Sequence, residues 1–547
     1  MRLTVEQAAQ LRGEDRYQAY GALDAAGTLE IYQTLRSRLN EVSEQQYRWT
    51  LAQRSPAVCM TIRGVKVNKE KRAIAVAELG ALLAVAEKDV AEDPLVSEVW
   101  DGTEMETGFC SVLREAEYFK AGPKKGLIKK AAGQQRHKWL KAETEEARTC
   151  ERCGCGRMKP SAFNPSSPDQ VKRLLYVLLK APIQRNKKGD ITTDWDALEA
   201  IGRKKPKLNN LCQKLLVIRD LDKQLGSLQA QLSQFDRFHS SFNVGGAWTG
   251  RWSSSQDPFR RGGNLQNITE QHRFVFEADR GMTMFYADLK TAESLIVAYM
   301  SGDENYIEAH KSDVHTYVCR LVWPELPWTG DIKQDKKIAT STYPEWDNVP
   351  GHDFRFQSKG VQHGSNYGLS PFGMAIMRHI PVKAAKHAQQ QFFKAFPGIP
   401  EWQQWTKARV QAGLPIRNPL GREVRLFGRP DDGATHKQAY AFGPQSAVGD
   451  ILNLGLYRAW DMGDPHEIQL LAQIHDAILG QFPDGSTTAL PLLKEAMEIP
   501  VEITDFRGVT RTCTIPVEVA IGKNWGKRNT DPKKGRLNED GLEEVPL

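Results

Sequence analysis

The chain has 547 residues, of which 40% are hydrophobic and 26% are charged, an ordinary balance for a soluble globular protein. No apolar run approaches the roughly 18 residues that span a bilayer, and the first residues lack the apolar core of a secretory signal. The formal net charge of +7 mildly favours a polyanionic partner. Eight cysteines do not make a disulfide scaffold at this length, so we expect a reducing, cytoplasmic setting without a membrane.

Two helices are predicted near the start of the chain. Residues 16–40 contain good helix formers and few breakers, and residues 64–91 form a longer helix that a short turn opens. The alanine and leucine spacing of the second helix suits packing against other helices. In the first helix, Tyr20 and Asp24 have the spacing Tyr-x3-Asp.

A densely basic segment follows at residues 120–141, where no Asp or Glu interrupts the positive charges. Surface faces usually mix both signs, so we predict a sequence-independent, salt-sensitive contact with a nucleic-acid backbone. A solvated charged face is the alternative. The basic residues are Lys120, Lys124, Lys125, Lys129, Lys130, Arg136, Lys138 and Lys141.

Three cysteines lie directly after the basic segment. Cys150, Cys153 and Cys155 form a Cys-x2-Cys pair beside glycine, which is typical of a zinc knuckle. Cys110 or His137 could complete four ligands. No second Cys-x2-Cys pair exists, so reduced structural thiols are the alternative.

Two further helices and a long loop come next. One helix begins within residues 163–179 after a Ser-Pro start, and another is predicted over 214–235. Residues 248–268 are polar, rich in glycine and serine, and contain three arginines. A loop of this length in a compact fold usually carries function. A disordered linker is the alternative, against which Trp248, Trp252 and the NLQNI ending argue.

Two aspartates end predicted strands. Residues 282–288 form a strand that ends at Asp288, and a helix follows. Apolar residues alternate on both sides of the pair His475 and Asp476, which predicts a β-hairpin with that pair at its tip. An acid at a hairpin tip is often only a turn former, so Asp476 alone also has a structural interpretation.

A stripe of functional side chains runs along a helix predicted within residues 355–368. Arg355, Lys359, His363 and Tyr367 recur every fourth residue, which places two cations and then two rings on one face. The cations suit a triphosphate, and the rings suit a base and a sugar. The glycines beside the stripe are compatible with close approach of a ligand or backbone. A solvated amphipathic helix is the alternative for the stripe alone.

Together these features predict metal-dependent nucleotidyl transfer. Asp288 and Asp476 can meet on one sheet and hold two Mg²⁺ ions, which prefer oxygen ligands from carboxylates, phosphate and water. Two metals about 3.5–4 Å apart can activate an attacking hydroxyl and stabilise the leaving oxygen. The cationic stripe would bring a triphosphate to the metals, where catalysis is mostly positioning and charge stabilisation.

The motifs resemble those of family-A DNA polymerases. YADLKTAES resembles motif A, FRFQSKGVQHGSNYG resembles motif B and LAQIHDAIL resembles motif C. The similarity covers roughly residues 15–527, with the motifs in the right order. Further matching segments are TGRWSSSQDPFRRGGNLQNI, DVHT at 313–316, PQSAVGDI at 444–451, FNPSSPDQ, and PVEVAIGKNW at 516–525.

The resemblance implies an α+β right-hand polymerase with an antiparallel palm sheet, helical fingers and a helical thumb. It implies primer–template DNA and deoxynucleoside triphosphates as partners, with two Mg²⁺ ions for which Mn²⁺ can substitute, and we expect a monomer. A separate exonuclease or processivity factor could join the chain, and the compact layout favours a phage. The expected domains are an exonuclease remnant (1–50), a helical lead-in (51–109), a basic cysteine-containing insertion (110–160), the thumb (161–245), the palm with motif A (246–300), the fingers with motif B (301–430), the palm with motif C (431–527) and a flexible tail (528–547).

The resemblance also implies roles for the catalytic residues. Asp288 and Asp476 would be the metal-binding carboxylates. Arg355 and Lys359 would grip the incoming triphosphate, and Lys359 would also protonate the departing pyrophosphate.

Nucleotide and primer contacts are implied in the same way. Tyr367 would close the nucleotide pocket beside Glu293, which occupies the position where the family uses Glu to exclude a ribose 2′-hydroxyl. Arg251 and Gln445 would contact the minor-groove side of the primer terminus, and His475 would lie near the primer end. Minor-groove acceptors are nearly common to all base pairs, so such contacts check pair geometry.

Three departures from the family pattern stand out. Motif B has His363 where Phe or Tyr is usual, and motif C has Ala477 where Glu is usual. Tyr20 and Asp24 resemble the last motif of a proofreading exonuclease, but its other carboxylates are missing, so we expect no intrinsic proofreading. The alternatives are a single-subunit RNA polymerase, which Glu293 and the His-Asp hairpin disfavour, and a catalytically silent DNA-binding protein.

Overall fold

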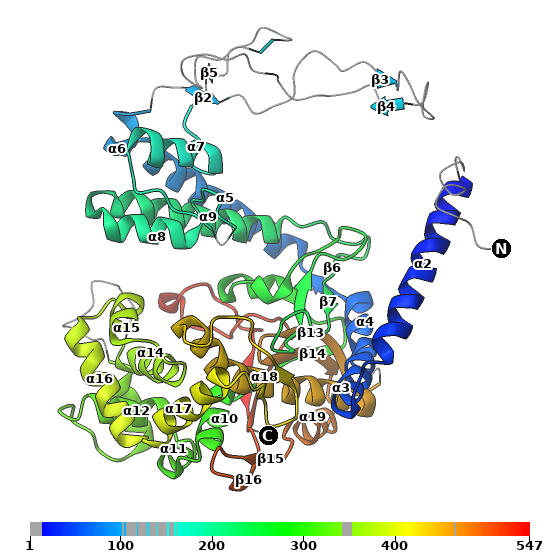
Figure 1. The fold of residues 1–547 in the computed structure, drawn as a ribbon, viewed down its shortest axis with the longest axis vertical. Helices are drawn as coiled ribbons and strands as arrows, with labels where there is room; N and C mark the ends of the chain where they lie inside the picture. Colours follow the sequence, from blue (N-terminus) through cyan, green and yellow to red (C-terminus); the bar gives the residue numbers. More distant parts are fainter. Residues whose placement is uncertain are drawn as a thin grey trace. The chain divides into compact units, whose positions relative to one another are not determined.

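The computed structural model (Figure 1) describes residues 14–100, 162–186, 188–341, 353–463 and 466–546, with short stretches at 103–105, 117–118, 128–130, 138, 150–151 and 158–160. The chain forms two compact units. One combines Met1–Lys69 with Ala230–Leu547, and the other is Glu70–Gln229. Within the described ranges, no helix combines the length and apolar character that a membrane crossing needs.

The unit Glu70–Gln229 is helical, with a core of fully buried leucines that includes Leu174 and Leu211. Local sequence sets several helix starts; Asp194, for example, accepts a hydrogen bond from the Ala197 N–H at 3.0 Å and caps α8. The helices are α5 (Lys69–Ala91), α6 (Pro94–Ser97), α7 (Pro168–Lys172), the π-helix η1 (Arg173–Leu178), α8 (Trp195–Lys204), η2 (Pro206–Leu208) and α9 (Asn209–Leu228).

In and beside this unit, several helix and domain boundaries differ from those predicted. The helix predicted over 214–235 begins and ends earlier, as α9. The predicted lead-in (51–109) is divided, because α5 packs into the same core as α7 and α9 through Leu83, Ala86 and Val90. The predicted opening turn of the 64–91 helix is instead a strand, β1 (Val65–Val67), which pairs with β6 (Arg237–Phe238) and β9 (Phe276–Glu277).

Most of the basic and cysteine-containing segment lies outside the described residues. Lys138 forms an ion pair with Glu151 at 2.6 Å, and Cys150 is buried. Cys110, His137, Cys153 and Cys155 are not described, so the predictions of zinc and of backbone contact remain predictions. The strands described here are β2 (Thr103–Met105), paired with β5 (Met158–Pro160), and β3 (Glu117–Tyr118), paired with β4 (Ile128–Lys130).

An antiparallel five-stranded sheet organises the other unit, with strand order β13-β14-β10-β17-β18. Phe285, Ala287 and Leu289 of the central strand are buried on one face, whereas Tyr286 and Asp288 are partly exposed on the other. The strands are β10 (Met282–Leu289), β13 (Gln469–Ile474), β14 (Ala477–Pro483), β17 (Val517–Gly522) and β18 (Glu543–Val545).

The last strand corrects the prediction of a flexible tail. Glu543, Glu544 and Val545 pair with Ile521, Ala520 and Val519, so β18 satisfies backbone groups that β17 would otherwise expose at the edge of the sheet. The polar composition of the tail did not predict this strand. The pairing of β18 depends on the neighbouring strand, and the side chains of β18 are largely exposed.

A helical layer carries the remaining functional segments. Its core contains large buried rings, among them Tyr306, Phe392, Phe396 and Trp402. Figure 1 draws these helices in colours that run from green through yellow to orange-brown, with the long helix α18 beside α10 and α19. The helices are α10 (Ala292–Ser301), α11 (Glu304–Ala309), α12 (Val314–Val322), α13 (Ile332–Ala339), α14 (Phe354–Asn366), α15 (Pro371–Arg378), α16 (Val382–Ala395), α17 (Gly398–Gln411), α18 (Gly433–Gly463) and α19 (Ala489–Met497).

Shorter elements complete this unit. The 248–268 loop, predicted to carry function, includes β8 and ends in η3, whose Gln266 donates hydrogen bonds to Gln473 Oε1 (2.9 Å) and to its carbonyl (3.3 Å). The remaining elements are α2 (Glu14–Arg36), α3 (Glu41–Ala52), α4 (Arg54–Arg63), β7 (Ser241–Asn243), β8 (Ser253–Ser255), η3 (Leu265–Asn267), η4 (Glu270–Val275), β11 (Ile416–Arg417), β12 (Glu423–Val424), β15 (Val501–Thr504), β16 (Thr510–Cys513) and η5 (Pro532–Lys534).

Candidate active site

Strand pairing brings the two predicted aspartates together. Asp288 lies opposite Ala477 in the β10–β14 ladder, so it neighbours the hairpin tip that carries Asp476. The Leu289 N–H donates to the Asp476 carbonyl at 3.2 Å. His475 has a φ of 53°, the left-handed conformation that a two-residue hairpin turn requires. The predicted strand end and hairpin are both present.

The environment of Asp288 disfavours its charged form. Burial is the largest cause, and the like charges of Asp476 and Glu518 add to it, which raises the pKa of Asp288 to about 7. Lys359 and Arg273 act in the opposite direction but do not cancel the effect. The influence of Lys359 shows that the α14 cation lies within electrostatic reach of the carboxylate.

Arg251 joins the second aspartate to motif A. Burial raises the pKa of Asp476, and Arg251 partly offsets that rise. One guanidinium nitrogen of Arg251, Nη2, donates to Glu293 Oε1 at 2.5 Å and to Asp476 Oδ1 at 3.0 Å. Sequence reasoning assigned Arg251 to the primer and did not predict these two ion pairs.

Tyr367 and Glu293 form the side of the site predicted to face the nucleotide sugar. The Tyr367 hydroxyl donates to Glu293 Oε2 at 2.5 Å. Burial and the adjacent Glu293 carboxylate hold the pKa of Tyr367 well above its ordinary value, so the phenol stays protonated and remains a donor. His363 packs edge-on against Tyr367, with ring centroids 4.9 Å apart.

The first three residues of the predicted stripe occupy the outer face of α14, whereas Tyr367 follows the last residue of that helix, Asn366. Lys359 and His363 are exposed, Arg355 is partly exposed, and the opposite face of the helix is buried. Lys359 has no hydrogen-bond or ion-pair partner among the described residues. Arg355 instead makes a two-point ion pair with Asp313, at 3.0 and 3.1 Å.

Asp313 is a site residue that sequence reasoning left without a role, although the DVHT match contains it. Burial alone would raise its pKa, but the hydrogen bonds and charge of Arg355 lower the pKa of Asp313 to about 2. The same carboxylate caps α12 by accepting hydrogen bonds from the His315 N–H and the Thr316 hydroxyl. Asp313 therefore holds the Arg355 side chain in a defined orientation.

The glycines beside the stripe are explained by packing against neighbouring side chains. A Cβ at Gly360 would lie 2.3 Å from Arg378 Nε, and one at Gly364 would lie 3.0 Å from Leu369 Cδ2. The close approach expected there is therefore made by residues within and before α15.

A match to the family described as DNA polymerase family A covers residues 134–527. The chain belongs to this family.

Curated family A relatives are similar over about two thirds of the chain. A thermostable DNA polymerase I of Thermus filiformis is 26% identical over 405 residues, 69% of this chain and 43% of the relative. DNA polymerase I of Treponema pallidum is 26% identical over 384 residues, 66% of this chain and 35% of the relative. The chain thus spans less than half of these relatives' length.

A solved polymerase domain has the same fold. The polymerase domain of Pol1 from M. smegmatis, in complex with DNA primer-template and dNTP, aligns with a TM-score of 0.59 and 20% identity, covering 87% of this chain and 69% of that one. The α+β architecture predicted from the sequence is confirmed.

Motif C has Ala477 where the family usually has Glu, so β14 places no carboxylate directly beside Asp288. On the other side, Glu518 of β17 lies opposite Asp288 and forms an ion pair with Lys290 at 2.6 Å. Sequence reasoning gave Glu518 no role, although the PVEVAIGKNW match contains it, because only strand register brings it beside Asp288. Among the described residues, no group of three or more His, Cys, Asp or Glu side chains is arranged to hold a metal.

Asp288 and Asp476 nevertheless suit Mg²⁺. Both are carboxylates with raised pKa values, so a bound cation would relieve the repulsion and desolvation that disfavour their charged forms. Mg²⁺ commonly uses one or two protein carboxylates and takes its remaining ligands from substrate phosphate and water. The donor set therefore fits this ion.

The remaining predicted primer contacts lie near the same hairpin or on α18. His475 is exposed at the hairpin tip. Gln445 follows the interior Pro444 of α18, is partly exposed, and has no hydrogen-bond partner among the described residues. Both side chains remain open to a ligand, and their primer roles remain predictions.

Proposed function

We propose that the chain is a DNA-directed DNA polymerase that adds deoxynucleotides to a primer 3′ end and releases pyrophosphate. The observation that carries the proposal is the convergence of Asp288, Asp476 and Lys359, which come from a strand, a hairpin and a helix far apart in the sequence. Family membership and the intact motifs support it further.

The proposed mechanism assigns each polar group a task. Asp288 and Asp476 would hold two Mg²⁺ ions, which supply charge stabilisation for in-line phosphoryl displacement. Lys359, exposed and without a partner in the described structure, would contact the triphosphate and protonate the leaving pyrophosphate. Arg355 would add a second cation, held in orientation by its two-point pair with Asp313.

The Glu293–Tyr367 hydrogen bond supports selection of deoxynucleotides. It fixes a carboxylate and a ring side by side at the position that motif A and motif B assign to the nucleotide sugar. A ribose 2′-hydroxyl would have to displace this short contact or lie against it. The pair therefore favours DNA synthesis over the alternative of a single-subunit RNA polymerase.

Arg251, Gln445 and His475 are proposed to contact the primer terminus. For Arg251 this would require loosening at least one of its ion pairs when DNA binds. We further propose a cytoplasmic, monomeric enzyme of phage or bacterial replication or repair, open to a separate exonuclease or processivity factor. In α2, Asp24 is exposed and the Tyr20 side chain is not described.

Primer extension tests the proposal. A 5′-labelled primer on a DNA template should be extended with Mg²⁺ and deoxynucleotides but poorly with ribonucleotides. Asp288→Ala should abolish extension, whereas Asp484→Ala, an exposed acid at the end of β14 paired with Lys523, should not. An intact primer when nucleotides are omitted would support the absence of proofreading. A folded, DNA-binding chain that extends nothing would refute the proposal.

A further inference from the structure

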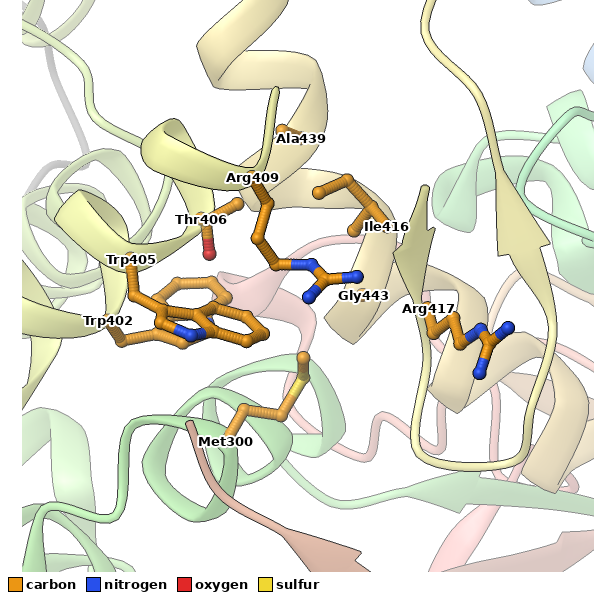
Figure 2. A pocket seen from close by; sticks show the side chains of 9 residues that line it. All are labelled: Met300, Trp402, Trp405, Thr406, Arg409, Ile416, Arg417, Ala439 and Gly443. Atoms are coloured by element: carbon orange, nitrogen blue, oxygen red, sulfur yellow. The ribbon is translucent and has the colours of Figure 1, made fainter. Parts of the chain in front are cut away.

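A cavity lies away from the carboxylates of Asp288 and Asp476. It has a volume of about 260 Å³ and is lined by residues of α10, α17, β11 and α18. Figure 2 shows two indoles, Trp402 and Trp405, on one side and Met300 at its base. The polar groups of Thr406 and Arg409 reach into the space from above.

An unsatisfied hydroxyl faces this cavity. Thr406 is 2% exposed, and its Oγ1 has no hydrogen-bond partner among the described residues. In Figure 2 this oxygen points toward the space between Trp405 and Arg409. A buried hydroxyl without a partner costs about 1–3 kcal/mol, so the cavity favours an occupant that hydrogen-bonds to Thr406.

The polar groups that line the cavity favour a ligand that accepts hydrogen bonds. Arg409 carries only donors, and of these one is used, from Nη2 to the Pro415 carbonyl at 3.0 Å. Its guanidinium also lies 5.1 Å from the centroid of the Trp405 ring. None of the described residues that line the cavity is Asp or Glu, so nothing there would attract a cation.

The walls favour a flat, apolar body. Trp402 and Trp405 are three residues apart on α17 and therefore share one face of the helix. The facing stretch of α18 presents only Ala439 and Gly443, one turn apart. A Cβ at Gly443 would lie 2.6 Å from Met300 Cε, so the small residue leaves the space open beside that side chain.

We propose that this cavity binds the base of a nucleoside monophosphate. The base would lie against the indoles and accept hydrogen bonds from Thr406 and Arg409. Its sugar and phosphate would extend out of the cavity toward solvent, where Arg417 is already paired with Glu423 at 2.6 Å and points away from the indoles in Figure 2. The volume is below the roughly 300–1,000 Å³ of sites for drug-sized ligands, which suits a single ring system.

This site is separate from the carboxylate centre. Met300 lies seven residues beyond Glu293 on α10, which is about 10 Å along the helix axis at about 1.5 Å per residue. Binding here requires neither metal nor template, so the inference does not depend on polymerase activity.

Equilibrium dialysis with radiolabelled 2′-deoxyadenosine 5′-monophosphate tests the proposal on the full chain in EDTA. Saturable binding of one equivalent is expected, with competition by free adenine and little by inorganic phosphate. Thr406→Val keeps the shape of the side chain but removes the hydroxyl, and it should weaken binding about tenfold. Arg409→Met removes the positive charge at the cavity and should weaken binding similarly. Its control is Arg429→Met, which removes the charge of an exposed arginine outside the cavity and should leave binding unchanged.

Three further variants keep the test decisive. Ala439→Met fills the cavity without removing a polar group and should abolish binding while the chain remains folded by circular dichroism. Lys359→Ala should leave binding unchanged, as should Asp288→Ala, whether or not the chain extends primers. No saturable binding would mean that water alone occupies the cavity and would overturn the proposal. Loss of binding in Lys359→Ala, or equal competition by phosphate, would overturn it as well.

Discussion

Replacing Asp288 by Asn should stabilise the metal-free chain at neutral and higher pH. A pKa of about 7 in the folded chain, against the ordinary value of 3.8, corresponds to about 4 kcal/mol of unfavourable free energy once the group is ionised. The folded state holds the proton more tightly than the unfolded state. This contribution to stability is therefore present at low pH and is lost as the pH rises from about 4 to about 7.

The isosteric amide carries no charge, so Asp288→Asn should escape that loss. We expect the variant to exceed the parent by about 2–4 kcal/mol at pH 8, a rise of a few degrees in unfolding midpoint, and to match it near pH 4. Thermal unfolding in EDTA at both pH values measures the difference. Mg²⁺ should raise the parent's midpoint and leave that of the variant nearly unchanged.

Asp484 provides the control. Its hydrogen bond with Lys523 lowers its pKa, so Asp484→Asn should give no stabilisation at pH 8. Equal midpoints for the parent and Asp288→Asn at pH 8, or a gain that does not depend on pH, would refute the view that burial and like charges make the ionised Asp288 destabilising.

Further predictions concern the other groups of the site and one buried pair. Glu293→Ala should raise ribonucleotide incorporation at least tenfold relative to deoxynucleotide incorporation in single-turnover assays; an unchanged ratio would reject its role at the sugar. Tyr367→Phe removes a hydrogen bond to a charged group, worth about 1.5–3 kcal/mol, and should lower deoxynucleotide incorporation efficiency about tenfold or more. Lys359→Ala should lower kcat by about 10²–10⁴-fold, with primer binding by anisotropy as the control. Asp450→Ala leaves the partly buried Arg422 without its carboxylate partner and should destabilise the chain by about 3–5 kcal/mol, which denaturant unfolding would detect.

Local sequence patterns predicted the elements that carry the proposed chemistry. The β10 strand, which ends one residue after Asp288, the hairpin tip at Asp476 and the exposed face of α14 are all present. These features follow from residue periodicity and turn chemistry within short windows, which depend little on the rest of the chain. The family resemblance rested on the same short motifs.

Contacts between distant segments were decided only by the tertiary structure. The pairing of Arg355 with Asp313, the two ion pairs of Arg251 and the position of Glu518 beside Asp288 each join different elements. A sequence pattern identifies which face of an element is polar, but the partner of each polar group depends on strand register and helix packing. For the same reason, the polar tail gave no signal of β18, which forms because β17 offers it a free edge.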